Sequence, residues 1–540
     1  KITNPDFVKT RLRELVLENP HRVTLVVAPD SKLDQQRKAR ETARLQGMRA
    51  DLDQSAIDNI RKLAQDLEDR QNQVDDVSIL PKLGLADIPK DVVTPALTRL
   101  DIDEHTRHFV GTAGTNGLVY QQIALKLPAL TPAQQERLPL LCALATEVGL
   151  GDTTYLEIQD RQSASVGSLS LSVSTRASRS DVNDISGFLV MSSKALAHKV
   201  SDQTRLMTDT LTAASFIEGE RIRELVKQIR ARRDQSISGA GHSLAMTAAC
   251  ASMSPLANLY HTQSGLEGIA RLRRLDYSLT DTSSLRSLSE ELTALRTHLL
   301  TTPSVNLLTV SDSKNCEAST DQLRSAANGL TSAGNLQPWS LSESAAGTNQ
   351  IWAANTQVNF CAKAYRTVSS GHLDAPTLSV LAAYLRNGFL HRSIREQGGA
   401  YGGGASHDGN VGAFRFFSYR DPRNLGTLSD FDASIDWVLS AEPDSLALEE
   451  AILSVISSLD KPASPSGEVK KAFYDGLYGR TADHKRALRA SIVSTTVEDL
   501  RRVTDTYLKP EVGCSVILTD PKTAASQALV DLGWTHHDLA

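Results

Sequence analysis

Hydrophobic and polar positions along this chain follow two periods, one typical of helices and one typical of strands. Residues 21–28 form an apolar, β-branched run that ends at a Pro-Asp pair, which predicts a strand. Farther on, apolar residues recur at helical spacing from Ile57 to Leu67, and residues 51–55 offer caps between this helix and a charged helix before it. Residues 1–95 therefore predict a strand and a helical-hairpin linker. The hairpin is either a spacer between larger bodies or an ordinary surface feature.

Residues 96–335 predict one α/β domain, in which strands alternate with helices. The predicted strands cover 116–125, 167–173 and 305–310, and the predicted helices cover 132–144, 155–163 and 202–233. We expect Pro139 to break or kink the first of these helices, because proline cannot donate to the helical hydrogen-bond ladder. The polar stretch 311–344 is predicted to be the next linker.

Residues 345–540 predict a second domain of the same plan. The predicted strands cover 358–365, 413–420 and 514–518, and the predicted helices cover 374–395, 446–458, 467–477 and 497–507. Asp374 is a suitable N-cap, and Arg395 falls in the last helical turn, where a cation interacts well with the helix dipole. Because the two domains share their order of elements, we interpret them as a diverged duplication, in which Gly167 corresponds to the glycine-rich run after Arg395.

That glycine-rich run is the most unusual stretch of the chain. From Arg395 to Gly404 it reads REQGGAYGGG, with five glycines and one tyrosine, Tyr401. Glycine allows positive φ and a close approach of backbone to another molecule. Arginine and a tyrosine hydroxyl are fixed donors that can meet a carbonyl oxygen or an oxyanion. The alternative is a plain turn, with an arginine at a helix end and a packed tyrosine.

Composition and charge exclude several classes of function. The chain has 540 residues, 40% of them hydrophobic, and a net charge of −5, so nothing suggests a nucleic-acid or anionic-membrane partner. No apolar run is long enough for a transmembrane helix, and no signal segment is visible, so we expect a cytoplasmic or organelle-matrix location. The five cysteines are scattered, which indicates neither a disulfide framework nor a thiolate zinc site. Since the sequence begins with Lys1, we expect it to be a piece of a longer protein.

Three stretches resemble the presequence-protease and falcilysin-type metallopeptidases of the pitrilysin–insulinase superfamily. The run REQGGAYGG from Arg395, followed by FFSYRDP from Phe416, is similar to the last domain of that family. Residues 19–30 (NPHRVTLVVAPD) resemble its linker between halves, and residues 115–120 (TNGLVY) resemble the start of its third domain. The three stretches occur in the family's order, and the resemblance covers nearly the whole chain.

The resemblance implies a clamshell of two halves, each with two homologous domains. The expected fold is α+β: two pitrilysin-type α/β domains, each a mainly antiparallel sheet packed with helices, after the helical-hairpin linker. The family binds zinc on an inverted H-x-x-E-H helix of its first half, and this chain has no such motif. The resemblance therefore implies no metal in this chain, with zinc and the general base supplied by an N-terminal half, either attached or a separate partner.

The resemblance also assigns roles within the glycine-rich run. It implies that Arg395 and Tyr401 are catalytic, through binding of substrate carbonyls and of the oxyanion, and that Gly398, Gly399 and Gly402 bind the peptide substrate. The expected function is that of the C-terminal half of a zinc-dependent metalloendopeptidase that degrades unfolded peptides in a closed chamber, inactive by itself. The alternative is a non-catalytic subunit of the same superfamily that binds peptides or serves as a scaffold.

The histidines offer one weak alternative for a metal site. Of the thirteen, His105 and His108 are three residues apart with Glu104 adjacent, in a segment that leads into a strand, so we expect solvated surface and not a shared metal-binding face. His536 and His537 are expected to form a polar tail. No G-x-x-x-x-G-K-[ST] or G-x-G-x-x-G motif is present in a strand–helix setting, so phosphate binding is not indicated either.

Overall fold

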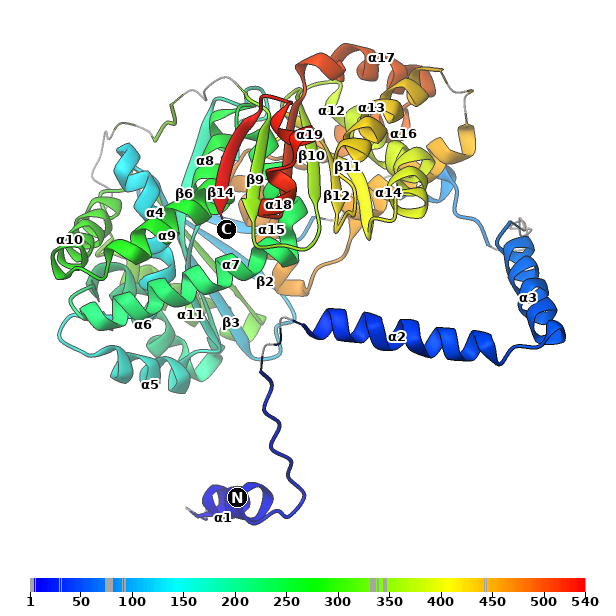
Figure 1. Ribbon diagram of the computed structural model, residues 1–540. Coiled ribbons are helices and arrows are strands. Elements are labelled where there is room, and N and C mark those ends of the chain that lie inside the picture. Colours follow the sequence, from blue (N-terminus) through cyan, green and yellow to red (C-terminus); the bar gives the residue numbers. More distant parts are fainter. Residues whose placement is uncertain are drawn as a thin grey trace. The chain divides into compact units, whose positions relative to one another are not determined.

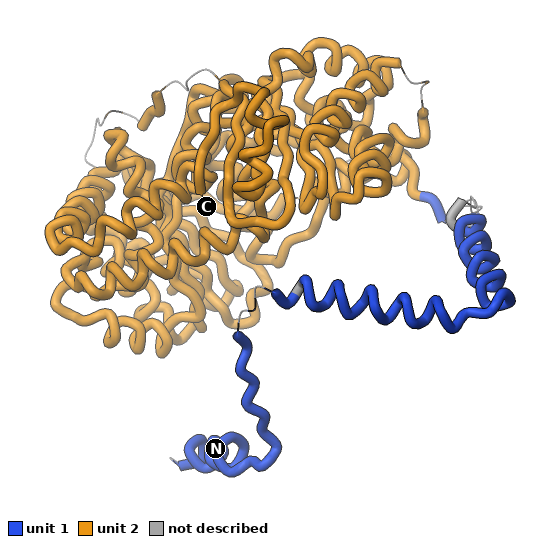
Figure 2. Tube along the Cα trace, viewed as in Figure 1, with its two compact units in different colours: residues 1–82 blue, residues 83–540 orange. Residues whose placement is uncertain are grey.

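The computed structural model describes residues 4, 6–28, 30, 32–72, 81–89, 91, 94–330, 337, 339–342, 347–440, 442 and 444–539. The chain divides into two compact units, residues 1–82 and residues 83–540 (Figure 2). The domain boundaries predicted at residues 95, 335 and 345 stay predictions. No helix among the described residues is long and apolar enough to cross a membrane.

In its described residues, the first unit contains three helical segments and one extended segment. The helical segments are α1 (Phe7–Leu12), which continues directly into the π-helical turn η1 (Arg13–Leu17), then α2 (Leu33–Ala50) and α3 (Gln54–Asn72). The predicted cap lies between α2 and α3, where the Asp53 carboxylate accepts the N–H of Ala56 at 2.7 Å. The prediction of a strand over residues 21–28 is wrong. The segment is extended, but among the described residues no strand pairs with it.

The second unit begins with a six-stranded sheet in the order β1-β2-β8-β3-β6-β5 (Figure 1). Its strands are β1 (Thr98–Asp101), β2 (Thr106–Thr112), β3 (Leu118–Lys126), β5 (Ser168–Ala177), β6 (Ile185–Leu196) and β8 (Val305–Ser311). Its helices are α4 (Pro132–Leu144), α5 (Tyr155–Ser165), α6 (Val200–Ala213), α7 (Gly219–Cys250), α8 (Pro255–Ser264), α9 (Leu266–Ser278), α10 (Thr282–Leu299) and α11 (Ser313–Ala327). Short elements are η3 (Leu85–Asp87), β4 (Gly149–Leu150), η4 (Ala197–Lys199) and β7 (Ala214–Ser215).

Two predictions for this region need correction. The stretch predicted as a linker from residue 311 holds the helix α11, and the single helix predicted over 202–233 is two, α6 and α7. Of the predicted break or kink at Pro139, the break is absent, because α4 runs through this residue. Because Pro139 has no N–H, the carbonyl four residues earlier, that of Gln135, needs another donor, and it accepts a hydrogen bond from the side chain of Gln263 at 2.7 Å.

The same unit holds a second six-stranded sheet, in the order β11-β12-β10-β13-β9-β14. Its strands are β9 (Gln350–Ala354), β10 (Phe360–Arg366), β11 (Gly402–Asp408), β12 (Ala413–Tyr419), β13 (Cys514–Thr519) and β14 (Thr535–Leu539). The helical elements are α12 (Ala375–Leu385), the π-helical continuation η5 (Arg386–Gln397), α13 (Leu425–Ser440), α14 (Ser445–Asp460), α15 (Pro465–Leu477), α16 (Ala482–Val493), α17 (Val497–Tyr507), η6 (Pro510–Val512), α18 (Pro521–Ala524) and α19 (Gln527–Val530).

In this second sheet the strands β9, β11 and β14 were not predicted. His536 and His537 lie in β14 and not in a polar tail, and the His537 ring stacks on Trp352 with 4.1 Å between ring centroids. Asp374 does precede α12, but its side chain caps no backbone N–H. Its carboxylate instead accepts hydrogen bonds from Arg502 and from the Tyr507 hydroxyl, each at 2.7 Å.

Five strands of each sheet share one order and one set of directions, which agrees with the predicted duplication, whereas the sixth strand differs: β1 pairs antiparallel with β2, and β14 pairs parallel with β9. In the first, β8 pairs parallel with β2 and antiparallel with β3. In the second, β13 pairs parallel with β9 and antiparallel with β10. At one edge of each sheet lies a strand that follows a glycine: β5 comes after Gly167, and β11 begins at Gly402. The glycine-rich run therefore occupies the position of Gly167 in the other sheet.

Each of the two sheets is packed against a helix that comes from the other half of the sequence. The C-terminal half of α7 carries Leu244 and Ala248 into the same hydrophobic cluster as Phe360 of β10, on one face of the second sheet. In return, α15 places Val469 and Phe473 in a cluster with Leu308, on the first sheet. Since each sheet is covered by a helix from the other half of the sequence, burial of apolar surface holds the two sheets together as one body.

Candidate functional site

The helix end before the glycine-rich run is built by the backbone. Arg395 lies in the last turn of η5, as predicted, and its carbonyl accepts the N–H of Gly399 at 3.0 Å. The carbonyl of Ile394 accepts the N–H of Ala400 at 3.1 Å. Gly399 has φ +78°, the left-handed conformation that ends many helices and that glycine adopts without strain. The chain can therefore reverse within a few residues and enter β11.

The glycines of this turn differ in how closely they are packed. A Cβ on Gly398 would lie 2.0 Å from Nη2 of Arg423 and 2.6 Å from the Ile394 carbonyl oxygen. On Gly402 a Cβ would meet no heavy atom within 4 Å. Gly398 is therefore required by packing inside the protein, whereas Gly402 leaves open space beside the strand. Substrate binding by Gly398, Gly399 and Gly402 stays a prediction.

Tyr401 projects from the turn instead of packing in the core. Its side chain is 67% exposed, and one edge of the ring meets Tyr419 with 5.6 Å between centroids. The N–H of Tyr401 donates to the carbonyl of Arg420 at 3.3 Å, which ties the turn to the end of β12. The interpretation of Tyr401 as a packed residue is wrong, because most of its ring lies in solvent.

Tyr419 is itself held from two other directions. The His242 ring of α7 meets it at 4.8 Å between centroids, and the Arg420 guanidinium lies 5.4 Å from the Tyr419 centroid. Arg420 has φ +50°, which is uncommon for a residue with a side chain. The Tyr401 ring therefore rests on a support that combines β12 with a helix from the first sheet.

Arg395 is exposed and available to a ligand. Among the described residues, none forms a hydrogen bond or ion pair with its side chain, whereas the adjacent Glu396 lies 3.3 Å from the ring of His391. Arg395 and Tyr401 thus lie at the two ends of the same turn, and both point polar groups outward. No hydrogen bond joins them in the described structure, so both retain their donors for another molecule.

The strand that follows the turn has a free edge. β11 is the first strand of its sheet, and in the described part of the chain β12 is its one strand neighbour, with Gly402 opposite Tyr419. The outer N–H and C=O groups of an edge strand can pair with another extended chain. An edge that starts at Gly402, next to Tyr401, is suited to a peptide backbone.

Residues around the turn anchor it from below. Asp421 is fully buried, and its carboxylate accepts hydrogen bonds from the Thr427 hydroxyl at 2.7 Å and from the N–H of Arg423 at 2.9 Å. The Arg423 guanidinium donates to Asp430 at 2.7 Å and fills the space beside the Cα of Gly398. These contacts fix the turn against α13 and leave its outer face open.

The histidines take structural positions in the described chain. His108 is buried and not solvated as predicted: its Nε2 lies 2.9 Å from the Thr309 hydroxyl, and burial lowers its pKa to about 4. Burial also lowers the pKa of His407 to about 4 and that of His242 in the same direction. Among the described residues, no group of three His, Cys, Asp or Glu side chains is placed to hold a metal ion.

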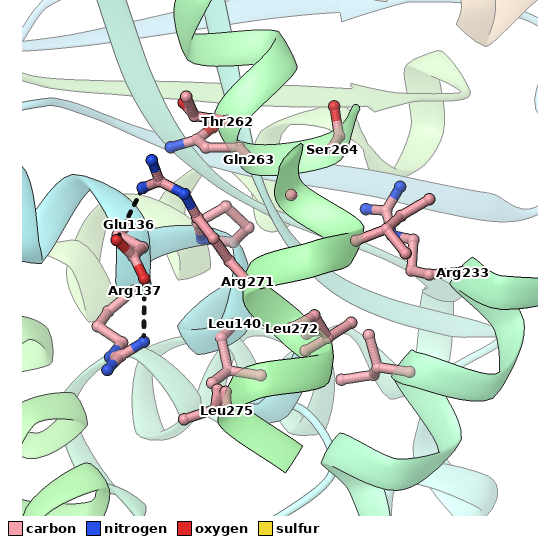
Figure 3. A pocket seen from close by; sticks show the side chains of 15 residues that line it. Glu136, Arg137, Leu140, Arg233, Thr262, Gln263, Ser264, Arg271, Leu272 and Leu275 are labelled. Carbon is pink, nitrogen blue, oxygen red and sulfur yellow. Dashed lines mark hydrogen bonds and ion pairs between the residues drawn. The ribbon is translucent and has the colours of Figure 1, made fainter. Parts of the chain in front are cut away.

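A small cavity of about 100 Å³ lies elsewhere, between α4, α8 and α9 (Figure 3). Figure 3 shows Arg271 reaching Glu136, 2.9 Å away, at its rim, while Leu140 and Leu272 lie along its wall. Arg137 and Arg271 at its rim are both paired with Glu136, and its walls are largely apolar. We therefore take it as a packing gap between helices and not as the functional site.

Three features of the site could not be found from sequence patterns. His242 lies far from Tyr401 along the chain, and only the packing of α7 on the second sheet brings it to Tyr419. The edge position of β11 depends on strand order, which residue periodicity does not contain. For Tyr419, the aromatic run before it gave a signal for a strand but not for contact with Tyr401.

Comparison with known proteins gives matches along most of the chain. A family model for the associated domain of subfamily C of the M16 peptidases matches residues 27–275, and one described as "PreP C-terminal domain" matches residues 349–519. The mitochondrial presequence protease of Danio rerio is 27% identical over 554 residues, which cover 96% of this chain and 52% of that protein. The chain thus spans about half the length of the curated relatives it matches.

Solved structures support the same fold. A protease from Helicobacter pylori aligns with a TM-score of 0.58 at 13% identity, covering 79% of this chain and 100% of that one. A "peptidase M16 inactive domain" from Pseudomonas fluorescens aligns with a TM-score of 0.53 at 13% identity, covering 79% and 98%. At these identities the likeness concerns the fold alone, and it confirms the predicted α+β fold of pitrilysin type.

Proposed function

We propose a function from the premise that this chain belongs to the presequence-protease family of M16 peptidases and corresponds to the C-terminal half of its members. In this proposal the chain forms one wall of a chamber in which a zinc-dependent endopeptidase degrades unfolded peptides. It binds the peptide backbone and stabilises the charge that develops on the attacked carbonyl. The observation that carries the proposal is the pair of exposed donors, Arg395 and Tyr401, beside the open edge of β11.

Zinc does not fit the part of this chain that the structure describes. No three potential ligands converge there, and of the pair considered from the sequence, His105 precedes β2 whereas His108 lies within it, buried against Thr309. The proposal assigns zinc and the general base to the N-terminal half, with which this chain would have to assemble.

The two donors would act differently on a bound peptide. The Tyr401 hydroxyl is neutral, and it can donate a hydrogen bond to an oxyanion without attracting a carboxylate. Arg395 carries a permanent charge and a planar set of donors, which suits substrate carbonyls on either side of the cleaved bond. The edge of β11 would align the peptide as an added strand, and the open space at Gly402 would let its backbone approach closely.

The test compares two substitutions in the full-length enzyme that contains this chain. We expect Tyr401→Phe to lower kcat by about 10²–10³-fold, the effect of losing one oxyanion donor, and to change KM little. Tyr277→Phe is the matched control, since Tyr277 is 82% exposed and lies on α9. We expect Arg395→Gln to raise KM and lower kcat/KM, with Arg392→Gln, at another arginine of η5, as its control.

Other outcomes would refute the proposal. Unchanged kcat in Tyr401→Phe would remove Tyr401 from catalysis. Peptide binding without cleavage by the full-length protein would instead favour the non-catalytic subunit. Hydrolysis by the isolated chain that is lost on mutation of its own Glu or His residues would show that the chemistry lies within this chain. The relatives are named as mitochondrial or chloroplastic proteins, so an organelle matrix is the proposed location, testable by fractionation.

A further inference from the structure

One segment of the first unit has the composition of a protein core but lies in solvent. Residues 21–28 are extended, and Val23, Leu25, Val26 and Val27 are 93%, 81%, 84% and 83% exposed. Four neighbouring large apolar side chains at this level of exposure are unusual on the surface of a folded protein. The segment is therefore expected to be covered by something outside the described chain.

The sequence around this segment occurs twice more in the chain. Each copy has a helix, a proline, an apolar run, an Asp-x-Lys triplet and a second helix. The prolines are Pro20, Pro303 and Pro510, the aspartates are Asp30, Asp312 and Asp520, and the lysines are Lys32, Lys314 and Lys522. The aspartates of the first and third copies form the same local contact, because each accepts the N–H of the lysine two residues later, at 2.8 Å and 2.9 Å. Residues 7–32 are thus a third copy of a unit that both sheets contain.

In both of the other copies the apolar run is an inner strand of a six-stranded sheet. These runs are β8 and β13, and each has a parallel neighbour on one side and an antiparallel neighbour on the other. Aligned on the aspartates, Val26 corresponds to Leu308 and to Val516, both with no exposed surface. A strand that is apolar on both faces is typical of such a doubly covered position.

The helix before the segment shows the same pattern. In the other copies this helix is α10 or α17, and both bury an apolar stripe among neighbouring helices, α10 against α4 and α17 against α12 and α13. In α1 and η1 the corresponding stripe is Val8, Leu12 and Leu15, spaced for one helical face, and these side chains are 73%, 57% and 64% exposed. The helix therefore lacks the neighbouring helices that its counterparts have, just as the strand lacks a sheet.

We propose that residues 7–30 are the last helix and an inner strand of a further α/β domain, separate from the two in this chain, whose remaining strands belong to the N-terminal half. The occupant is a sheet of the same topology that lacks one inner strand. It would take residues 21–28 between a parallel and an antiparallel neighbour. The inference rests on the proposed function only for the existence of that half. It corrects the sequence interpretation of residues 1–95, since a linker would begin only after Asp30.

A second copy of this chain fits the segment less well. Both sheets of the chain already contain their own inner strands, β8 and β13, so neither has a vacant inner position. Pairing of two copies through residues 21–28 would cover the strand edges but leave the two apolar faces in water. A domain that lacks an inner strand covers both edges and both faces.

The test is amide hydrogen exchange, measured on the 540-residue chain and on the protein made from the complete coding sequence that contains it. We expect residues 21–28 to exchange rapidly in the isolated chain and at least about 100-fold more slowly in the complete protein, as for an inner strand. Equal, rapid exchange in both proteins would overturn the proposal. Protection in the isolated chain that appears only with dimerisation, followed by sedimentation, would overturn it in favour of a second copy.

A variant pair makes the result specific. In the complete protein, Val26→Asp should return exchange of residues 21–28 towards the rate in the isolated chain, whereas Leu373→Asp, at an 88% exposed apolar residue outside any strand, should not. If Val26→Asp prevents folding, the comparison of the two unmutated proteins still decides. The readout is independent of cleavage, so an inactive protein with residues 21–28 protected would refute the proposed function and leave this inference standing.

Discussion

Gly398 and Gly402 lie four residues apart in one turn, and the structure predicts opposite effects for the same substitution. Alanine at Gly398 places a methyl group 2.0 Å from Nη2 of Arg423 and 2.6 Å from the Ile394 carbonyl oxygen. The arginine end could move if it were free. Its guanidinium, however, donates to Asp430 at 2.7 Å and to the Ser393 carbonyl at 3.3 Å, and the carbonyl of Ile394 belongs to the helix.

The magnitude follows from these contacts. Inserting one methyl group into packed surroundings costs about 1–3 kcal/mol, and weakening a partly exposed ion pair, such as that between Arg423 and Asp430, adds up to about 1 kcal/mol. Replacing glycine lowers the entropy of the unfolded chain, which offsets about 0.4–1 kcal/mol. We therefore expect Gly398→Ala to lower the free energy of unfolding by about 1–3 kcal/mol. Gly402→Ala meets no atom within 4 Å, so its stability should equal or slightly exceed that of the unmutated chain.

Urea unfolding of the isolated chain, followed by tryptophan fluorescence, measures the stability difference. Trp437 stacks on Tyr384 at 5.3 Å between centroids, so its emission reports on the α12–α13 region behind the turn. In the full-length enzyme, Gly402→Ala should instead raise KM, because its methyl group occupies the side on which a peptide would approach. Equal stability of the two variants, or a Gly402→Ala enzyme with unchanged KM, would refute this account of the turn.

Three further predictions concern stability. Burial lowers the pKa of His407 and of His261 to about 4, so between about pH 6.5 and pH 4 the unfolded chain binds more protons than the folded one. The free energy of unfolding should therefore decrease as the pH is lowered through this range. In urea titrations at a series of pH values, His407→Gln should make this decrease smaller. Burial raises the pKa of Asp374, but the hydrogen bonds from Arg502 and Tyr507 outweigh this and leave it lowered. Its stabilisation should therefore be present above about pH 4 and lost as pH falls below that value, and Asp374→Asn should remove this dependence. Gln263→Leu should lower the free energy of unfolding by about 1–3 kcal/mol, because the Gln135 carbonyl loses its hydrogen-bond donor. The loss should be smaller in a Pro139→Ala background, which restores a backbone N–H, and equal losses in both backgrounds would contradict this role.

The sequence predicted the elements that carry the site more reliably than the contacts among them. Apolar periodicity gave the strands β10, β12 and β13 and the helices α14, α15 and α17 close to their observed bounds. It missed β9, β11 and β14, which gain their partners only when the sheet assembles. The bounds predicted for α4 are confirmed, but no break occurs at Pro139, where a side chain distant in sequence supplies the hydrogen bond that the proline cannot.

For the candidate site, the residue types in the sequence indicated which side chains could act as donors, but they did not indicate which distant residues pack around them. The run from Arg395 to Gly404 pointed to exposed donors and backbone approach, and the structure indeed leaves Arg395 and Tyr401 in solvent. Nothing local to the run identified His242 or Tyr419 as its support. His108 was misjudged as solvated for the same reason, since its burial against Thr309 depends on the pairing of β2 with β8.

The sequence alone determined where many of the helices and strands and the glycine turn lie, because these depend on φ, ψ preferences and on apolar spacing over a few residues. It also contained the repeated helix, proline, strand and Asp-x-Lys order that marks three copies of one unit. Only the tertiary structure decided that β11 is an edge, that α7 and α15 exchange sheets, and that residues 21–28 lack the partners that β8 and β13 have. Burial and pairing are properties of segments far apart in the chain, and local patterns cannot specify which of those segments meet.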